Sequence, residues 1–204
     1  MTEPVTEPVT EPAPAARLAA VAPAAPHAEG KARIAAAVDA AAAEILDLSH
    51  RIHANPEPAF EEVQAAAWVA EALRAHGFAV EHPVGLLATA VRATLPGGRG
   101  GAKPRIAVLA EYDALPGLGH GCGHNTMAAS GVGAAIALAA VADELPGEIV
   151  FFGTPAEERG SGKQIMIDEG LFAGIDAALL FHPCDRNHVQ IHPLASEDVE
   201  VVFH

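Results

Sequence analysis

Three apolar runs of strand length, separated by helical stretches, constrain the fold of this chain most. The runs are residues 106–110, 149–152 and 177–181, and the stretches between them, 126–142 and about 162–171, have the length and composition of helices. Strands that are apolar on both faces and alternate with helices are typical of a parallel sheet covered by helices. We therefore expect an α/β fold with a three-layer, parallel-rich sheet.

The residues before the first apolar run predict a tail followed by helices and short strands. The chain opens on repeated Thr-Glu-Pro and continues to Gly30 in Ala and Pro, which is typical of a disordered tail. Apolar residues at helical spacing then predict one helix from Lys31 to about Asn55 and a second from Glu61 to His76. Short strands are expected at 79–82 and 88–95.

Composition excludes several classes of function. With 12 basic and 26 acidic residues the net charge is -14, so binding to nucleic acid or to an anionic membrane is not expected. The apolar run 126–142 is shorter than the ~20 residues that cross a bilayer. Two cysteines, Cys122 and Cys184, do not make a disulfide framework, so we expect a cytoplasmic protein.

Ionisable residues follow each of the three apolar runs. The first run leads into Glu111-Tyr112-Asp113, the second into Glu157-Glu158, and the third into His182-Pro183. Successive right-handed crossovers would bring the carboxyl ends of these strands to one edge of the sheet, where ligands of open α/β sheets bind. The sequence therefore predicts a binding site at that edge.

A glycine-rich segment adds metal-binding residue types to this edge. His120, Cys122 and His124 alternate with glycines, and imidazole and thiolate are preferred ligands of zinc. Taken alone, the pattern favours another interpretation, in which Cys122 is a small buried apolar residue and the histidines lie on a surface loop. The convergence with the strand ends favours the metal site.

The adjacent carboxylates Glu157 and Glu158 also have two interpretations. They could cap the start of a helix, or one could bind a cation while the other takes a proton from the attacking water. A phosphate-binding loop is excluded, because Glu157 stands where that pattern requires glycine and Gln164 where it requires Ser or Thr. The glycines around 117–123 do not fit the dinucleotide-binding spacing.

Four ordered motifs resemble metallopeptidase family twenty, the group that contains acetylornithine deacetylase and carboxypeptidase G. The motifs are Ala110-Glu111-Tyr112-Asp113-Ala114-Leu115-Pro116, His120-Gly121-Cys122-Gly123-His124-Asn125, Gly153-Thr154-Pro155-Ala156-Glu157-Glu158 and Phe181-His182-Pro183. Because its second motif contains a cysteine, the chain resembles the amidohydrolase subfamily. Within that subfamily it is most similar to the aminobenzoyl-glutamate hydrolase and β-alanyl dipeptidase group. The resemblance implies a sheet of the zinc-exopeptidase type.

The same resemblance implies roles for individual residues. It implies that Cys122, His124, Glu158 and His182 are metal ligands, that Glu157 is the general base and that Asp113 is a carboxylate that orients a ligand. It further implies two divalent cations per site, zinc or manganese, and hydrolysis of an amide in a dipeptide or N-acyl amino acid by activated water. A homodimer is implied for the full-length protein.

The resemblance also implies a domain division. Residues 1–30 would be the tail, 31–194 the first part of the catalytic domain, and 195–204 the start of a lid and dimerisation domain that is cut short, with its last metal-binding histidine missing. An alternative is therefore kept open, in which the chain is a catalytically incomplete metal-binding fragment or subunit. An incomplete sheet would expose apolar surface, which favours association with another chain.

Overall fold

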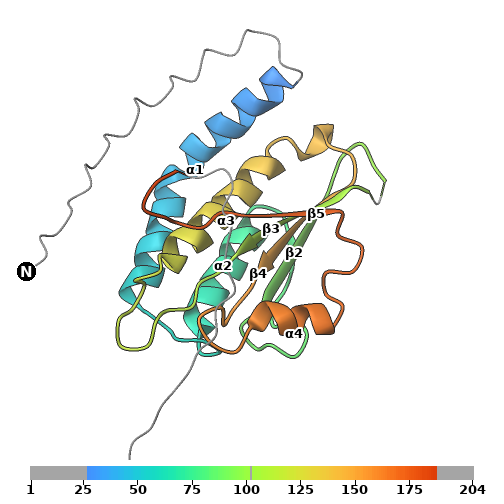
Figure 1. Ribbon diagram of the computed structural model, residues 1–204. Helices are drawn as coiled ribbons and strands as arrows, with labels where there is room; N and C mark the ends of the chain where they lie inside the picture. Colours follow the sequence, from blue (N-terminus) through green and yellow to red (C-terminus); the bar gives the residue numbers. More distant parts are fainter. Residues whose placement is uncertain (1–26, 102, 188–204) are drawn as a thin grey trace, which may run out of the picture.

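The computed structural model describes residues 27–101 and 103–187 and contains a five-stranded mixed sheet in the order β1-β2-β4-β3-β5 (Figure 1). The strands β3, β4 and β5 run parallel to one another, whereas β1 and β2 join the sheet in antiparallel pairs, β1 with β2 and β2 with β4. Their bounds are β1 Ala79–Glu81, β2 Val91–Pro96, β3 Arg105–Ala110, β4 Glu148–Gly153 and β5 Ala177–Leu180.

Helices cover both faces of the sheet. One face carries α1 (Ala28–Ala54), α2 (Val63–Ala75) and α3 (His124–Ala139), and the other carries the short α4 (Gly162–Asp168) (Figure 1). A short 3-10 helix, η1 (Ala142–Glu144), follows α3. The expected three-layer α/β architecture is therefore confirmed. None of the described helices is long and apolar enough to cross a membrane.

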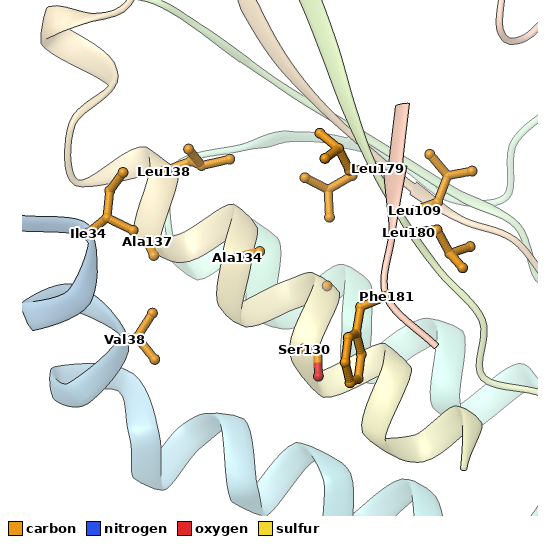
Figure 2. Close-up of a pocket in the computed structure, with 12 residues that line it drawn as sticks. Ile34, Val38, Leu109, Ser130, Ala134, Ala137, Leu138, Leu179, Leu180 and Phe181 are labelled. Atoms are coloured by element: carbon orange, nitrogen blue, oxygen red, sulfur yellow. The ribbon is translucent and has the colours of Figure 1, made fainter. Parts of the chain in front are cut away.

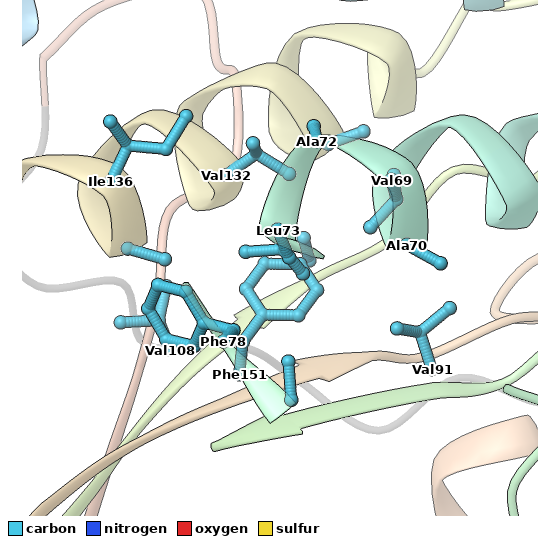
Figure 3. Close-up of a cluster of buried hydrophobic side chains, with 14 of the residues drawn as sticks. Val69, Ala70, Ala72, Leu73, Phe78, Val91, Val108, Val132, Ile136 and Phe151 are labelled. Atoms are coloured by element: carbon cyan, nitrogen blue, oxygen red, sulfur yellow. The ribbon is translucent and has the colours of Figure 1, made fainter. Parts of the chain in front are cut away.

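The main core lies between the sheet and the three helices on its first face. Figure 3 shows Val69 and Leu73 of α2 and Val132 of α3 packed over Val108 and Phe151 of the sheet. This cluster fixes α3 across the middle strands. The amino end of α3, which begins at His124, therefore lies beside the carboxyl ends of β3 and β4.

Two glycines allow α3 to lie in tight contact on both sides. A Cβ atom at Gly131 would come within 2.8 Å of the Ala110 Cβ, and one at Gly133 within 2.8 Å of the Ile45 Cδ1. Real Cβ atoms do not approach so closely, so at Gly131 only glycine fits without a shift of the sheet, and at Gly133 a side chain would displace the end of the Ile45 side chain. The apolar, glycine-containing run is thus a buried helix, as the sequence predicts.

Two features differ from the expectations. The helix α1 begins at Ala28, inside the segment predicted to be a tail. The strand β5, predicted to be covered on both faces, is exposed along its whole length because it is the outermost strand of the described sheet. The predicted tail before His27 and the predicted lid segment 195–204 lie outside the described residues.

The exposure of β5 leaves an open apolar groove of about 470 Å³ beside α1 and α3. Figure 2 shows Leu179 and Phe181 facing the groove from the end of the sheet, with Ser130 and Ala134 of α3 and Val38 of α1 across from them. Phe181, which lines the groove, is thus the residue immediately before His182 in the chain.

Candidate metal centre

The candidate site lies at the carboxyl edge of the three parallel strands. The loop after β3 supplies Glu111 and Asp113, the loop after β4 supplies Glu157 and Glu158, and the end of β5 leads into His182. The loop before α3 supplies Cys122, and His124 is the first residue of that helix. All six residues predicted for the site from the sequence are therefore brought to one edge of the sheet.

The His124 ring is fixed by Asp113. The ring Nδ1 lies 2.9 Å from the Asp113 carbonyl oxygen and 3.0 Å from its carboxylate Oδ1. Both partners are acceptors, so Nδ1 carries the proton and donates it. In the neutral ring the lone pair is then on Nε2, which is the arrangement that a metal-binding histidine requires.

The Nε2 atom of His124 faces three carboxylates. It lies 3.1 Å from Glu111 Oε2, 3.8 Å from Glu157 Oε2 and 3.9 Å from Glu158 Oε1. Nε2, the Glu111 oxygen and the Glu158 oxygen are all buried, and none has a hydrogen-bond partner of acceptable geometry. Buried polar atoms without a partner are rare in folded proteins, so three together indicate a place for a ligand.

The charge on His124 explains how these carboxylates lie so close together in the metal-free chain. Burial lowers the pKa of His124, but the carboxylates of Asp113 and Glu111 outweigh it and raise the pKa to about 10. The imidazolium ring therefore supplies positive charge at neutral pH. Burial raises the pKa of Glu157, and the negative charge of Glu111 raises it further.

Two buried carboxylates hold the loop that carries Glu157 and Glu158. Glu62, at the start of α2, accepts a hydrogen bond from the Ala156 N–H at 2.8 Å and another from the Thr89 hydroxyl at 2.9 Å. Asp113 Oδ2 accepts the Glu158 N–H at 2.9 Å. Ala156 has a positive φ of 57°, which is unusual for a residue with a side chain. These hydrogen bonds stabilise that conformation.

The second part of the site is formed by Cys122 and His182. The Cys122 Sγ lies 3.9 Å from the His182 Nε2, and together with His124 these residues offer three ligand atoms within 4.8 Å of one another. Burial raises the pKa of the Cys122 thiol, and the hydrogen bond to Glu158 and nearby carboxylates raise it further, to about 12. Gly123 stands between Cys122 and His124 in the chain, and a Cβ atom there would lie 3.0 Å from the Pro183 Cγ atom.

A second group of potential ligands contains a residue that sequence reasoning missed. Glu111, His124 and Glu157 also offer ligand atoms within 4.8 Å of one another. The position of Glu111 directly after a strand is visible in the sequence, but that position alone assigns no role to it. His120 belongs to neither group, and its ring lies 6.3 Å from the ring of His53.

The donor set fits a divalent cation. It combines imidazole, thiolate and carboxylate groups, and it includes the buried atoms that lack partners. An α/β sheet with such a set at the carboxyl ends of its parallel strands defines a class of metal-dependent enzymes that includes hydrolases.

The comparisons with known proteins identify the family of the chain. Residues 107–199 match the model of Peptidase family M20/M25/M40, so the chain carries part of a Peptidase M20 family domain. The family resemblance inferred from the four motifs is therefore confirmed.

Individual relatives agree with this assignment. The chain is 38% identical over 185 residues to a mouse (Mus musculus) protein named Xaa-Arg dipeptidase, and 39% identical over 166 residues to one of the subunits of p-aminobenzoyl-glutamate hydrolase from Escherichia coli. These alignments cover 85% and 72% of this chain, but only 43% and 34% of the relatives. The chain thus spans less than half the length of these relatives.

A solved structure supports both the fold and the type of site. The structure of a dinuclear metal-binding peptidase of the M20 family from Bacillus subtilis has a TM-score of 0.61 and 28% identity, covering 72% of this chain and 42% of that one. A putative aminohydrolase from methicillin-resistant Staphylococcus aureus has a TM-score of 0.64 and 26% identity, covering 72% and 41%. The Bacillus subtilis protein is thus a dinuclear metal-binding peptidase with a similar fold.

Proposed function

We propose that the complete protein is a metal-dependent hydrolase that cleaves the amide bond of a dipeptide or an N-acyl amino acid. The observation that carries this proposal is the His124 Nε2 atom. It is buried without a hydrogen-bond partner among three carboxylates, while Asp113 fixes the other ring nitrogen. A catalytic metal site requires such an oriented and unshared imidazole nitrogen.

Two divalent cations, zinc or manganese, would be held by Cys122, His124, Glu158 and His182. A cation held there lowers the pKa of a water molecule and stabilises the negative charge that develops on the carbonyl oxygen of the substrate. Asp113 orients His124 and, through the Glu158 N–H, also fixes the backbone of a second ligand.

Glu157 is proposed as the general base. The distances from His124 do not separate Glu157 from Glu158, but their exposure does, because the Glu157 side chain is 41% exposed and that of Glu158 is 16% exposed. The more accessible carboxylate can reach a water molecule and a substrate. Its pKa is raised by burial and by Glu111, which makes it a better proton acceptor.

The proton then follows a simple path. Glu157 takes a proton from water as the water oxygen forms its bond to the carbonyl carbon. When the bond between carbon and nitrogen breaks, Glu157 gives this proton to the departing amine. The carboxylate returns to its starting state, and the products are a carboxylate and an amine.

The substrate class is proposed from the relatives. The mouse relative is named a dipeptidase for Xaa-Arg, and the bacterial relative is named for p-aminobenzoyl-glutamate. These substrates share an amide bond next to a free carboxylate and differ in the charge of the released side chain. A direct comparison of the two kinds of amino acid therefore distinguishes the candidates.

The experiment uses the full-length protein, stripped with a chelator and reconstituted with Zn²⁺ or Mn²⁺. It is offered dipeptides ending in Arg or Lys, acyl-amino acids, and p-aminobenzoyl-glutamate, and the released amine is measured. We expect one of these classes of substrate to be hydrolysed, and to be hydrolysed only after the metal has been restored. Full metal loading without hydrolysis of any of these amides would contradict the proposal.

The alternative is that this chain is a metal-binding fragment or subunit without activity of its own. It is favoured by the exposed β5 strand and by the short coverage of the relatives. Under this alternative, metal binds to the 204-residue chain, but turnover requires a longer protein.

We further propose a homodimer of the full-length protein, located in the cytoplasm. Both follow from the family resemblance and from a composition without a disulfide framework. Analytical ultracentrifugation of the full-length protein tests the dimer, and fractionation of the source cells tests the location. A monomer, or recovery of the protein outside the cytoplasm, would contradict the respective proposal.

A further inference from the structure

The Glu111 carboxylate has two oxygens with different surroundings. Oε1 accepts a hydrogen bond from the Lys163 ammonium group of α4, and the same two groups form an ion pair. Oε2 lies 3.1 Å from the His124 Nε2 and has no hydrogen-bond partner. The Glu111 side chain is 4% exposed and that of Lys163 is 30% exposed. One oxygen is thus anchored while the other faces the centre of the site.

This division is not what a purely structural ion pair requires. A buried carboxylate is costly unless its oxygens are satisfied by hydrogen bonds or by charge. The Glu111 Oε2 atom and the His124 Nε2 atom are both buried, and neither has a hydrogen-bond partner. Two such atoms 3.1 Å apart are a pair of potential ligand atoms.

The charges of the site agree with a role for Lys163. Four carboxylates, Glu111, Asp113, Glu157 and Glu158, and the Cys122 thiolate carry five negative charges when all are ionised. Two divalent cations balance four of them. The ammonium group of Lys163, which contacts Glu111 directly, supplies the remaining positive charge.

We propose that Glu111 is a further metal ligand of this site and that Lys163 is a positioning residue that fixes its carboxylate for that role. The proposal rests on the metal site proposed above, but not on the hydrolysis reaction. Lys163 holds Oε1, so the side chain is already ordered before a cation binds through Oε2. Groups that orient a ligand in this way typically change metal affinity by about 10- to 100-fold when they are removed.

The test is a metal titration of the full chain and its variants with Zn²⁺ and Mn²⁺, by calorimetry with a competing chelator. We expect Glu111→Gln to weaken the binding of one cation by at least about 10-fold. Glu71→Gln is the matched control, because Glu71 is exposed on α2, away from the carboxyl edge of the sheet. If Glu111→Gln binds both cations within about threefold of the parent chain, the proposal is wrong.

Thermal denaturation with and without metal then tests Lys163. In Lys163→Met the Glu111 charge loses its partner, so the metal-free protein should melt earlier. A cation that binds more weakly stabilises the folded chain less, so the increase in Tm on adding metal should be smaller in both Lys163→Met and Glu111→Gln than in the parent chain. Equal increases in all three would show a merely structural ion pair. Lys31→Met, near the start of α1, is the control.

These outcomes separate this inference from the proposed function. A chain that binds metal through Glu111 but hydrolyses none of the amides would overturn the function alone. An active enzyme in which Glu111→Gln binds both cations normally would overturn this inference alone.

Discussion

The two halves of the candidate metal centre differ in how firmly the fold holds them. The inner half consists of Glu111, Asp113 and His124, whose side chains are at most 4% exposed and are fixed by hydrogen bonds or ion pairs. The outer half consists of Cys122, Glu157 and His182, of which Glu157 and His182 are exposed. The inner half rests on the packed core shown in Figure 3, whereas His182 follows the uncovered strand β5 of Figure 2.

This difference assigns separate consequences to the two halves. Changes in the inner half should affect both folding and metal binding, because its charges are buried and depend on one another. Changes in the outer half should affect metal binding or turnover with little effect on folding, because exposed side chains contribute little to stability.

The largest expected effect is on turnover and comes from the outer half. Glu157→Gln removes the proposed proton acceptor and should lower kcat of the full-length protein by about two to four orders of magnitude. Metal content, measured by elemental analysis, and Tm should stay close to those of the parent. Undiminished turnover together with lost metal would reverse the roles of Glu157 and Glu158.

The next effect is on stability and comes from the inner half. In the metal-free protein, His124→Ala leaves the buried Asp113 and Glu111 carboxylates without the imidazolium ring, which should cost about 3–5 kcal/mol in urea denaturation. Since the His124 pKa is raised from 6.5 to about 10, this stabilisation is complete below about pH 6.5 and is lost as the pH rises through about 10. His182→Ala is the corresponding substitution in the outer half, and it should lower the free energy of unfolding by less than about 1 kcal/mol. Equal costs would remove the distinction between the halves.

Metal affinity should depend steeply on pH, because each half holds a proton that a cation must displace. The pKa is about 10 for His124 and about 12 for Cys122 in the metal-free protein, so both groups are protonated at neutral pH. The apparent affinity should therefore increase with pH, by up to about 100-fold per unit between about pH 6 and 8. Zn²⁺ titrations in buffers of different ionisation enthalpy would count the released protons. An affinity that does not change with pH would exclude both groups as ligands.

The smallest effect concerns Glu62, which connects α2 to the loop of the outer half. Its pKa is raised by burial, so the folded protein favours the neutral acid. The stability that this neutral form contributes is present below about pH 4.5 and is lost as the pH rises through the raised pKa. Glu62→Gln should therefore gain stability relative to the parent as the pH rises. At low pH the free energies of unfolding of Glu62→Gln and of the parent should agree within about 1 kcal/mol. A difference that is constant with pH would show that Glu62 is not the titrating group.

The sequence was sufficient to predict the edge of the sheet and the six residues gathered there. The alternation of apolar runs and helices implied parallel strands, and parallel strands place their carboxyl ends together. Cys122, His124 and His182 could therefore be grouped although up to 60 residues separate them in the chain.

Other features depend on partners that the pattern does not reveal. The contact between Glu111 and Lys163 joins residues 52 positions apart, and an isolated carboxylate after a strand indicates no such pairing. The exposure of β5 follows from the order of strands in the sheet. The Glu62 side chain binds a backbone N–H 94 residues away, a contact that has no signature in sequence.

X-ray absorption by the zinc-loaded chain tests the central claim most directly, because it identifies the atoms that bind the metal. We expect a sulfur ligand at about 2.3 Å together with nitrogen or oxygen ligands at about 2.0–2.2 Å. The sulfur signal should disappear in Cys122→Ser and persist in Cys184→Ser, since Cys184 is exposed and its thiol instead donates to Asp185. A zinc ion without a sulfur ligand in the parent chain, or a sulfur signal that survives Cys122→Ser, would contradict the account.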